Sequence, residues 1–349
     1  MYGRLISLFR RRSPLRPALC SPLLAALLLG CSGDSPAGAP GDGASAATAP
    51  AAGVEERFWV DPDSPAARQV ARWEEAGRSG DARTLRLISE RPLAFWPSGH
   101  RDPAAQVRRI TSAAAADGST AVLVAYNIPH RDCGQYSEGG AGDAAAYRRW
   151  IGAFAEAIGE AHALVVLEPD AVPHTADGCT ASMYVDERYR ALAEAVERLK
   201  AQPHTRVYLD AGNPSWIEDP ALLTDPLRRS GIARADGFAL NVSNFQTLQD
   251  SAEYGHRLSA LLDGAHFVVD TSRNGNGPWE GVDEPWCNPP GRALGEPPTA
   301  HTGDPLIDAY LWIKRPGESD GECRGGPPAG TWWPEYGLAL AEAAAGRAS

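Results

Sequence analysis

Several patterns that would assign a function are missing from this sequence. The six cysteines include no Cys-x-x-Cys spacing and the eight histidines stand singly, so a zinc site has little support. There is no glycine-rich dinucleotide fingerprint and no Walker loop, which argues against a nucleotide cofactor. Basic residues are also few, because 33 Lys and Arg face 44 Asp and Glu and leave a net charge of -11. We therefore expect no metal, no cofactor and no nucleic-acid partner, since a polyanion would be repelled.

What is present describes a folded protein. Hydrophobic residues make up 43% of the 349 positions and charged residues 22%, close to the averages for globular domains. This length suits one large domain or two ordinary ones.

The amino-terminal segment has the composition of an export signal. Five arginines lie between positions 4 and 16, and an apolar run follows over residues 18–30. This run is short for a membrane span of ~20 residues but is typical of a signal peptide. Its ending, Leu28-Leu29-Gly30-Cys31, resembles a bacterial lipobox, in which Cys31 becomes the lipidated first residue. The alternative is an ordinary signal peptide in which Cys31 is incidental.

These features predict three parts of the chain. Residues 1–30 form the signal peptide, and residues 31–54 contain Cys31 and a Gly-, Ala-, Ser- and Pro-rich tether that cannot bury a core. Residues 55–349 form the folded domain. We expect an exported protein, secreted or held at the cell envelope, with membrane contact only through a lipid at Cys31.

Four cysteines remain in the folded part: Cys133, Cys179, Cys287 and Cys323. An even number in an exported chain predicts two disulfides, and three pairings are possible.

Strand-like and helix-like segments alternate along the folded part. Apolar runs predict strands at 93–96, 121–127, 163–167, 206–210, 237–241, 266–270 and 309–313. Amphipathic stretches predict helices at 103–117, 143–160, 186–202, 219–230 and 250–263. This alternation indicates an α/β fold with a parallel sheet, and so many units suit one barrel better than two domains.

Carboxylates follow several of the predicted strands. In a parallel barrel the carboxyl ends of the strands share one rim, so these side chains should converge there. Paired carboxylates suggest acid and base catalysis on a glycosidic bond. Each aspartate has a structural alternative as a helix cap or turn former, and a Ca²⁺ or Mg²⁺ site is a weaker option.

Six stretches carry a family resemblance: YNIPHRDCGQYSEGGA (126–141), LEPDAV (167–172), YLDAGNPSW (208–216), GFALNVSNF (237–245), WCNPPGRALG (286–295) and KRPGESDGEC (314–323). Over about residues 55–345 the chain resembles glycoside hydrolase family 6, which contains inverting endoglucanases and cellobiohydrolases acting on β-1,4-glucan. The resemblance implies a distorted seven-stranded parallel (β/α) barrel, similar to a TIM barrel, and a β-1,4-glucan substrate.

The resemblance assigns catalytic roles. Asp170 matches the general acid, and Asp132 matches the neighbour that raises its pKa. Asp320 matches a candidate base, which in an inverting enzyme lies ~6.5–9.5 Å from the acid. Asp210 resembles a supporting carboxylate near Arg131. In addition, Ser137 is a candidate for a water chain and Tyr126 resembles a residue that favours sugar distortion.

Further residues are candidates for sugar binding. By resemblance these are Lys314, Glu318, Asn213 and Asn241, together with Trp96, Trp216 and Trp286 as stacking platforms. Without the resemblance, Trp96 and Tyr126 would be interpreted as core aromatics and Lys314 with Glu318 as a surface pair. Two departures concern sugar contacts: Asn213 stands where the family often has His, and Phe245 where it often has Tyr.

The resemblance also implies the disulfide pairs Cys133–Cys179 and Cys287–Cys323, each clamping a loop of the site and contributing roughly 3–4 kcal/mol. The short segment from Asp270 to Trp286 predicts an open cleft and internal cleavage. We therefore expect a monomeric endo-β-1,4-glucanase. An exo-acting cellobiohydrolase and a non-catalytic glycan-binding lipoprotein are the alternatives.

Overall fold

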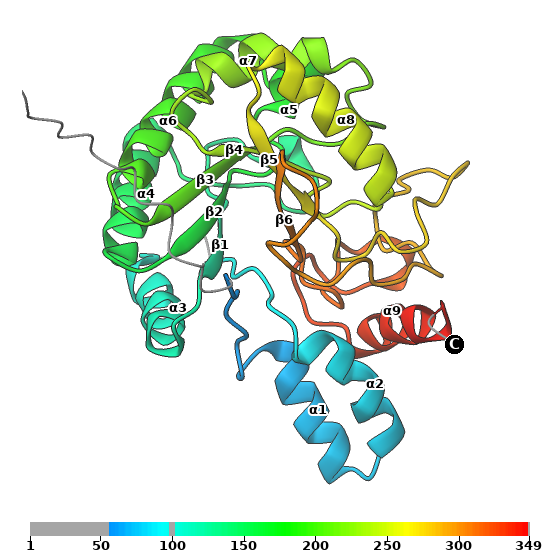
Figure 1. Cartoon of the computed structure of the whole chain (residues 1–349). Helices are drawn as coiled ribbons and strands as arrows, with labels where there is room; N and C mark the ends of the chain where they lie inside the picture. Colours follow the sequence, from blue (N-terminus) through cyan, green and yellow to red (C-terminus); the bar gives the residue numbers. More distant parts are fainter. Residues whose placement is uncertain (1–55, 98–101, 348–349) are drawn as a thin grey trace, which may run out of the picture. The chain divides into compact units, whose positions relative to one another are not determined.

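The computed structural model describes residues 56–97 and 102–347 (Figure 1). The predicted signal peptide, the lipidation site Cys31 and the tether to residue 54 lie outside the described residues. Within the described residues, no helix is both long and apolar enough to span a membrane.

A parallel sheet forms the centre of the fold. Its strands are β1 (Ala121–Ala125), β2 (Ala163–Leu167), β3 (Thr205–Asp210), β4 (Gly237–Leu240), β5 (His266–Asp270) and β6 (Ile307–Leu311). They are hydrogen-bonded in chain order, and every neighbouring pair is parallel. The predicted parallel α/β sheet is therefore confirmed, with six strands in the described part of the chain.

One of the seven predicted strands, residues 93–96, does not form. Phe95 instead makes a single parallel bridge to Leu123 in β1, and the Ala94 amide donates to the Trp312 carbonyl just after β6. The segment lies against both edge strands but is too irregular to complete a ladder. Tight spacing of apolar residues predicted a strand here, whereas Pro92 and Pro97 on its two sides withhold amide donors from a continuous ladder.

Helices cover the outer side of the sheet, where they form an arc around the strands in Figure 1. They are α3 (Ala104–Asp117), α4 (Ala144–Ile158), α6 (Ser182–Lys200), α7 (Thr224–Arg229) and α8 (Leu248–Leu261). The four-residue helix α5 (Pro173–Ala176) lies in the connection between β2 and α6. A 3₁₀ turn, η2 (Pro220–Leu223), precedes α7 and splits the helix predicted for 219–230. Asp143 and Asp219 are the N-caps of α4 and η2, with side chains that accept from the Ala146 and Ala221 amides.

Alternate residues of the strands pack in opposite directions. Leu123, Val165 and Val207 join the helices in a large outer core. Val122, Val166 and Val268 belong to a second cluster formed largely by the opposite faces of the strands. Both faces are thus covered, as expected for a parallel sheet with continuous apolar strands.

A third cluster joins helices that the sequence analysis missed. These are α1 (Pro65–Glu75), α2 (Ser79–Ser89) and α9 (Pro334–Arg347), from opposite ends of the described chain. Leu85 and Ile88 of α2 pack in one cluster with Leu340 of α9 and Trp312, which is 2% exposed as expected for a core aromatic. Two short 3₁₀ turns, η1 (Asp132–Gly134) and η3 (Cys323–Gly325), lie in the loops of the site.

Candidate active site

The loop after β2 has an unusual backbone. Glu168 and Asp170 both adopt positive φ angles, 49° and 69°, in a conformation that non-glycine residues rarely adopt. The fully buried Glu168 carboxylate accepts from the backbone amides of Asn127 and Ile128 in the loop after β1, at 2.9–3.0 Å. Burial raises the pKa of Glu168 to about 7. Sequence reasoning gave Glu168 no role, although its place directly after a strand was a signal. It ties the two loops that carry Asp132 and Asp170.

Asp170 is surrounded by other carboxylates. Burial, followed by the charges of Asp210 and Asp132, raises its pKa well above the ordinary value. One carboxylate oxygen of Asp170 lies within 4.8 Å of one of Asp132. The Tyr126 hydroxyl lies 3.4 Å from Asp170 Oδ2 and opposes this shift. The surroundings of Asp170 therefore favour its protonated form.

Asp210, at the end of β3, holds the Asp170 loop through a hydrogen bond to its backbone. Its Oδ2 accepts from the Asp170 backbone amide at 2.7 Å, and burial raises its pKa to about 7. Arg131, its expected neighbour, is engaged elsewhere: its guanidinium donates to the carbonyl oxygens of Ser137 and Tyr126. Asp210 thus acts on Asp170 through the backbone and through its charge.

The loop that carries Asp132 folds back on itself. Asp132 has a φ of 56°, and its Oδ2 accepts from the Ser137 backbone amide at 2.6 Å. Burial raises the pKa of Asp132, while this hydrogen bond and Arg131 oppose the shift. The backbone amide of Ser137 therefore positions Asp132, and Ser137 lies next to this carboxylate.

Aromatic residues stand beside these carboxylates. Trp96 and Tyr126 meet edge to face with centroids 5.6 Å apart, and the Trp96 indole donates to the Ile313 carbonyl. The guanidinium of Arg131 lies over the Tyr126 ring at 4.6 Å. The structure therefore brings Trp96 and Tyr126 together, both half-buried.

Arg188 of α6 was not predicted from the sequence. It is 4% exposed and donates to the carbonyl oxygens of Pro129 and His130 and to the Thr180 hydroxyl. The positive charge of Arg188 opposes, but does not cancel, the rise in the pKa of Asp170. No motif in the sequence distinguishes Arg188 from the other arginines that lie on helices.

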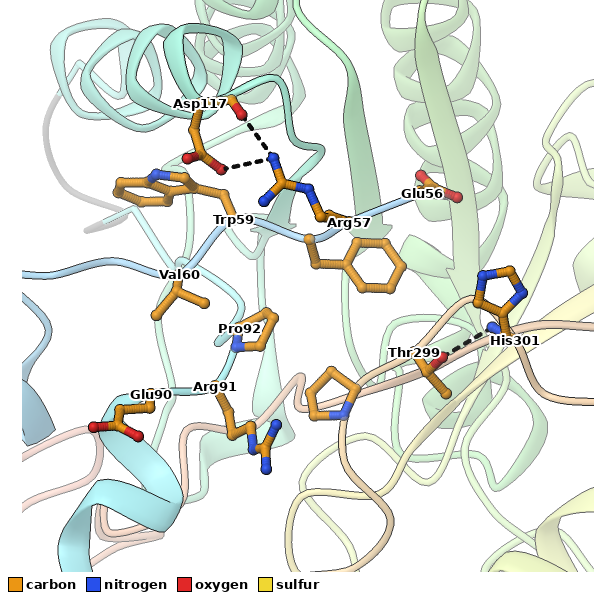
Figure 2. Close-up of a pocket in the computed structure, with 12 residues that line it drawn as sticks. Glu56, Arg57, Trp59, Val60, Glu90, Arg91, Pro92, Asp117, Thr299 and His301 are labelled. Carbon is orange, nitrogen blue, oxygen red and sulfur yellow. Dashed lines mark hydrogen bonds and ion pairs between the residues drawn. The ribbon is translucent and has the colours of Figure 1, made fainter. Parts of the chain in front are cut away.

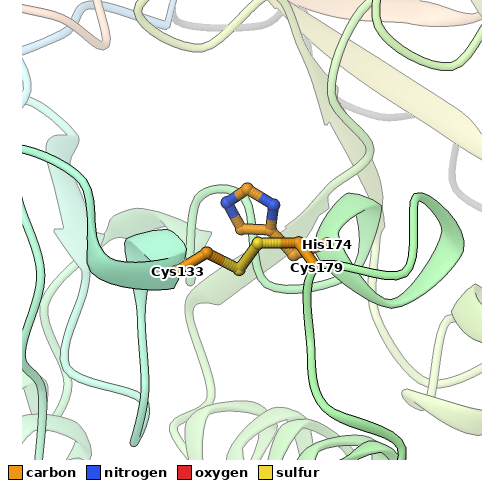
Figure 3. Close-up of side chains that lie close together, drawn as sticks. All are labelled: Cys133, His174 and Cys179. Atoms are coloured by element: carbon orange, nitrogen blue, oxygen red, sulfur yellow. A yellow bond between two sulfur atoms is a disulfide. The ribbon is translucent and has the colours of Figure 1, made fainter.

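Both implied disulfides are present. Cys133–Cys179 joins the η1 turn to the loop after α5, and His174 lies alongside it (Figure 3). Asp177 in that loop receives the Trp216 indole N–H at 2.9 Å, and the Trp216 ring meets His174 edge to face at 4.8 Å. Trp216 is thereby linked to the loop that follows Asp170.

Asp320 lies in a separate network in the loop after β6. Its carboxylate accepts from Arg273 Nη1 at 2.8 and 3.0 Å and from the Asn288 amide, and Lys314 Nζ lies 3.1 Å away. Burial alone would raise the pKa of Asp320, but Arg273 and Lys314 hold it below its usual range. Asp320 is therefore ionised at neutral pH. Sequence analysis missed Arg273, which is fully buried.

The second disulfide, Cys287–Cys323, brackets the segment that contains Asp320. Asn288, next to Cys287, donates its side-chain amide to the carbonyl oxygens of Gly321 and Cys323. Trp286, just before it, is half-buried and meets Tyr136 of the Asp132 loop at 5.9 Å. The two loop systems are thus in contact through aromatic rings.

Other predicted sugar-binding residues have partners within the protein. Asn241 bonds to the carbonyl oxygens of Gln246 and Asp270, and its own oxygen accepts from the Gln246 amide. Asn213 accepts from Ser215 and Trp216 in a side-chain turn. Both asparagines therefore hold loops. The motifs predicted that both side chains contact sugar. The local sequence does not distinguish an asparagine that binds sugar from one whose hydrogen bonds hold a loop.

Lys314 and Glu318 are also paired. Besides Asp320, Lys314 Nζ contacts the Ser319 carbonyl at 3.1 Å. Glu318, 5% exposed, forms an ion pair with Arg315 at 2.8 Å. Asp270, at the end of β5, accepts from the Lys314 amide and so connects β5 to this loop.

Two hollows lie away from these carboxylates. One, of about 480 Å³, is at the amino-terminal end of β1 and is lined by residues including Arg57, Trp59, Asp117 and His301 (Figure 2). The other, of about 530 Å³, lies between Pro214–Ser215 and α8. Neither contains the acid residues described above.

Two groups bring potential metal-ligating atoms within 4.8 Å: Cys133, His174 and Cys179, and Asp132, Asp170 and His174. The sulfurs of the first are joined to each other and so are not thiolate ligands. In the second, the charge of Asp132 contributes to the raised pKa of Asp170, so the two carboxyls favour sharing a proton. We interpret this group as one for proton transfer.

The comparisons with known proteins agree with the geometry. Residues 54–344 match the family model described as "Glycosyl hydrolases family 6". The chain belongs to glycosyl hydrolases family 6.

Named relatives in this family include endoglucanases and, at lower identity, probable 1,4-β-D-glucan cellobiohydrolases. The chain is 42% identical over 287 residues to Endoglucanase A of Cellulomonas fimi, covering 81% of this chain and 60% of that protein. It is 44% identical over 282 residues to Endoglucanase 1 of Streptomyces sp. (strain KSM-9), covering 78% and 76%. It thus spans about 60% of the length of the Cellulomonas protein.

A solved family 6 structure has the same fold. The endoglucanase of Mycobacterium tuberculosis in complex with methyl-cellobiosyl-4-deoxy-4-thio-β-D-cellobioside superposes with a TM-score of 0.77 at 42% identity. The match covers 84% of this chain and 98% of that one. The overall fold of this chain is therefore that of a solved family 6 endoglucanase.

Proposed function

We propose that this family 6 chain is an inverting endo-β-1,4-glucanase that hydrolyses internal bonds of cellulose or soluble β-glucan. The observation that carries the proposal is the environment of Asp170, a buried carboxyl next to Asp132 and Asp210. A carboxyl whose pKa is raised by burial and neighbouring carboxylates is the group needed to protonate a glycosidic oxygen.

The proposed reaction begins with proton transfer from Asp170 to the leaving oxygen as the glycosidic bond breaks. Positive charge then develops on the sugar, and the nearby Asp132 carboxylate stabilises it. A water molecule attacks the opposite face of the sugar and loses its proton to a second carboxylate, which inverts the anomeric centre.

Asp320 is our candidate for that second carboxylate. Its lowered pKa keeps it ionised, as a proton acceptor must be. The same low pKa makes it a weak base, because Arg273 and Lys314 compete for its oxygens. A water chain that includes Ser137 offers a path by which the proton leaves the attacking water, and Ser137 lies against Asp132.

Half-buried aromatic rings supply stacking surfaces for sugars. Trp96, Trp216 and Trp286 each stand in a loop beside the carboxylates and each contacts an aromatic ring or His174. Pyranose rings pack on such faces, so we propose these three as sugar platforms. Lys314 and Glu318 complete the proposed binding set from the last loop.

Internal cleavage is favoured by the short segment between β5 and Trp286, which supplies little chain to roof a tunnel. The relatives named endoglucanase favour the same mode. We further propose that the protein is an exported monomer, held at the membrane only by lipid at Cys31.

The test is hydrolysis of carboxymethyl cellulose by the purified protein, with viscosity, reducing ends and the anomer of the first product measured together. A rapid fall in viscosity with an α-anomeric product supports the proposal. A slow fall with cellobiose as the main product indicates exo action instead. No sugar release from this polymer or from barley β-glucan, by protein with both disulfides formed, would refute it.

The matched variant is Asp170→Asn, which removes the proton but keeps the shape. We expect the rate on carboxymethyl cellulose to fall by ~10²–10⁴, the usual contribution of a general acid. Binding to the polymer in affinity electrophoresis should remain. A variant with near wild-type turnover would remove Asp170 from the acid role.

A further inference from the structure

His174 is a buried titratable group that the proposed reaction does not use. It lies in α5, directly after the Asp170 loop, and its backbone amide donates to the Asp170 carbonyl at 2.9 Å. His174 is 5% exposed, and its Nε2 has no hydrogen-bond partner among the described residues. A buried polar atom without a partner costs free energy and requires an explanation.

The surroundings of the ring determine its tautomer. Nδ1 lies 3.4 Å from Asp177 Oδ2, a carboxylate oxygen that also accepts the Trp216 indole N–H. Nδ1 therefore carries the proton and donates to Asp177, so Nε2 is left with its lone pair. Burial lowers the pKa of His174, which keeps the ring neutral.

The ring stands against the two carboxylates of the proposed acid pair. One ring nitrogen of His174 and one oxygen each of Asp132 and Asp170 all lie within 4.8 Å of one another. Such a separation is spanned by a direct contact after small movement or by one bridging water. The Cys133–Cys179 disulfide beside the ring holds its surroundings in place (Figure 3).

We propose that His174 is a positioning residue for the acid. Its Nε2 lone pair accepts a hydrogen bond from the protonated carboxyl of the Asp132–Asp170 pair, and Asp177 fixes the ring tautomer that makes this possible. The inference rests on the proposed function, in which Asp170 must be protonated. A neutral acceptor stabilises the protonated carboxyl over the charged one and so keeps the proton on the pair. No proton is consumed, because the ring only accepts a hydrogen bond.

The charged groups that face His174 come from every element packed around it. Asp177 favours protonation of the ring and Arg188 of α6 opposes it. The full set is Asp132 from η1, Asp170 before α5, Asp177 after α5 and Arg188 from α6.

Two variants of His174 test the roles of the two ring nitrogens separately. The amide of His174→Asn overlays Nδ1 and keeps a donor for Asp177, but nothing reaches the Nε2 position. The longer amide of His174→Gln places its oxygen near Nε2 and supplies an acceptor to the carboxylates. His162→Asn is the control, because His162 precedes β2 at its opposite end and stacks on His204.

The main readout is the dependence of kcat/KM on pH with an unactivated cello-oligosaccharide. In His174→Asn the basic limb should move down by about one pH unit, a roughly tenfold loss above that limb. His174→Gln should restore the limb, and His162→Asn should leave it unchanged. An aryl cellotrioside with an acidic leaving group needs less protonation, so it should lose less activity.

A structural role for His174 predicts a different result. Both variants would then lower stability and activity at all pH values without moving the limb. That outcome, or equal limbs in wild type and His174→Asn, would overturn the inference.

A second readout does not depend on catalysis. The aspartate carboxyl carbons can be titrated by NMR in ¹³C-labelled protein, with the Asp170 signal identified by its loss in Asp170→Asn. The Asp170 pKa should be lower in His174→Asn than in wild type, whether or not any glucan is hydrolysed. An unchanged Asp170 pKa would refute the role of His174, whereas a shifted pKa in a protein without hydrolase activity would refute only the proposed function.

Discussion

Replacing Asp320 with asparagine should destabilise the protein strongly, because it leaves the buried Arg273 and the partly buried Lys314 without their counter-ion. Arg273 is fully buried and places Nη1 at 2.8 and 3.0 Å from the two carboxylate oxygens. Lys314 Nζ lies 3.1 Å from the same group. The substitution keeps the shape of the side chain and removes only the charge.

The expected magnitude follows from the burial of this network. Breaking a buried pair by removing one partner costs ~3–5 kcal/mol, since the remaining charge is not solvated. We expect a value of about 3 kcal/mol, at the lower end, because the asparagine oxygen still accepts one hydrogen bond from Arg273. The loss concerns the loop between Cys287 and Cys323, so activity should fall as well.

The assay is urea unfolding of both proteins at pH 7 with the disulfides intact. The control is Glu197→Gln, which breaks the exposed pair with Arg234, where the side chains are 54% and 64% exposed. Such a surface pair contributes only ~0–1 kcal/mol. If Asp320→Asn lost no more than this control, the view of Asp320 as a buried counter-ion would be wrong.

The same network predicts a pH dependence. The pKa of Asp320 is lowered in the folded protein, so its contribution to stability is complete above the unfolded value of ~3.9. This contribution is lost as the pH falls through the lowered folded pKa. The difference in unfolding free energy between wild type and Asp320→Asn should therefore shrink in strongly acidic solution, and a difference that grew instead would contradict the assignment.

Two further predictions concern the loops of the acid. In Tyr126→Phe the hydroxyl that lowers the pKa of Asp170 is lost, so the basic limb of kcat/KM should move up by less than one pH unit; a downward shift would contradict the contact. Gly140→Ala should cost at least ~2 kcal/mol in urea unfolding, because φ is +96° and a Cβ would lie 1.9 Å from the Ile128 carbonyl oxygen. Gly142→Ala is the control, since nothing lies within 4 Å of its added Cβ; equal losses in the two variants would refute the steric argument.

Much of the sheet could be predicted from local pattern alone. Continuous apolar runs predicted β2 and β5 at the bounds observed, since strands buried on both faces need apolar residues at every position. Amphipathic spacing likewise predicted α3 and α4 to within two residues at each end. The helices α1, α2 and α9 were missed, because their apolar faces are completed by each other across the length of the domain.

The candidate site divides in the same way. The carboxylates at the strand ends were visible in the sequence, since β2 and β3 each lead directly into an acidic residue of the site. The pairing of four cysteines was open from spacing and came only from the family resemblance. The irregular segment 93–96 also required the folded structure, because its single bridge depends on the edges of β1 and β6.

The sequence by itself determined which residues carry charge, which segments are apolar enough to form the sheet, and which side chains follow each strand. Only the tertiary structure decided their chemical states. Asp170 and Asp320 are both aspartates after strands, yet one is raised in pKa by burial among carboxylates and the other is lowered by Arg273 and Lys314. Burial and partners distant in sequence cause this difference, because desolvation and Coulomb energy depend on distance in space and not on position along the chain.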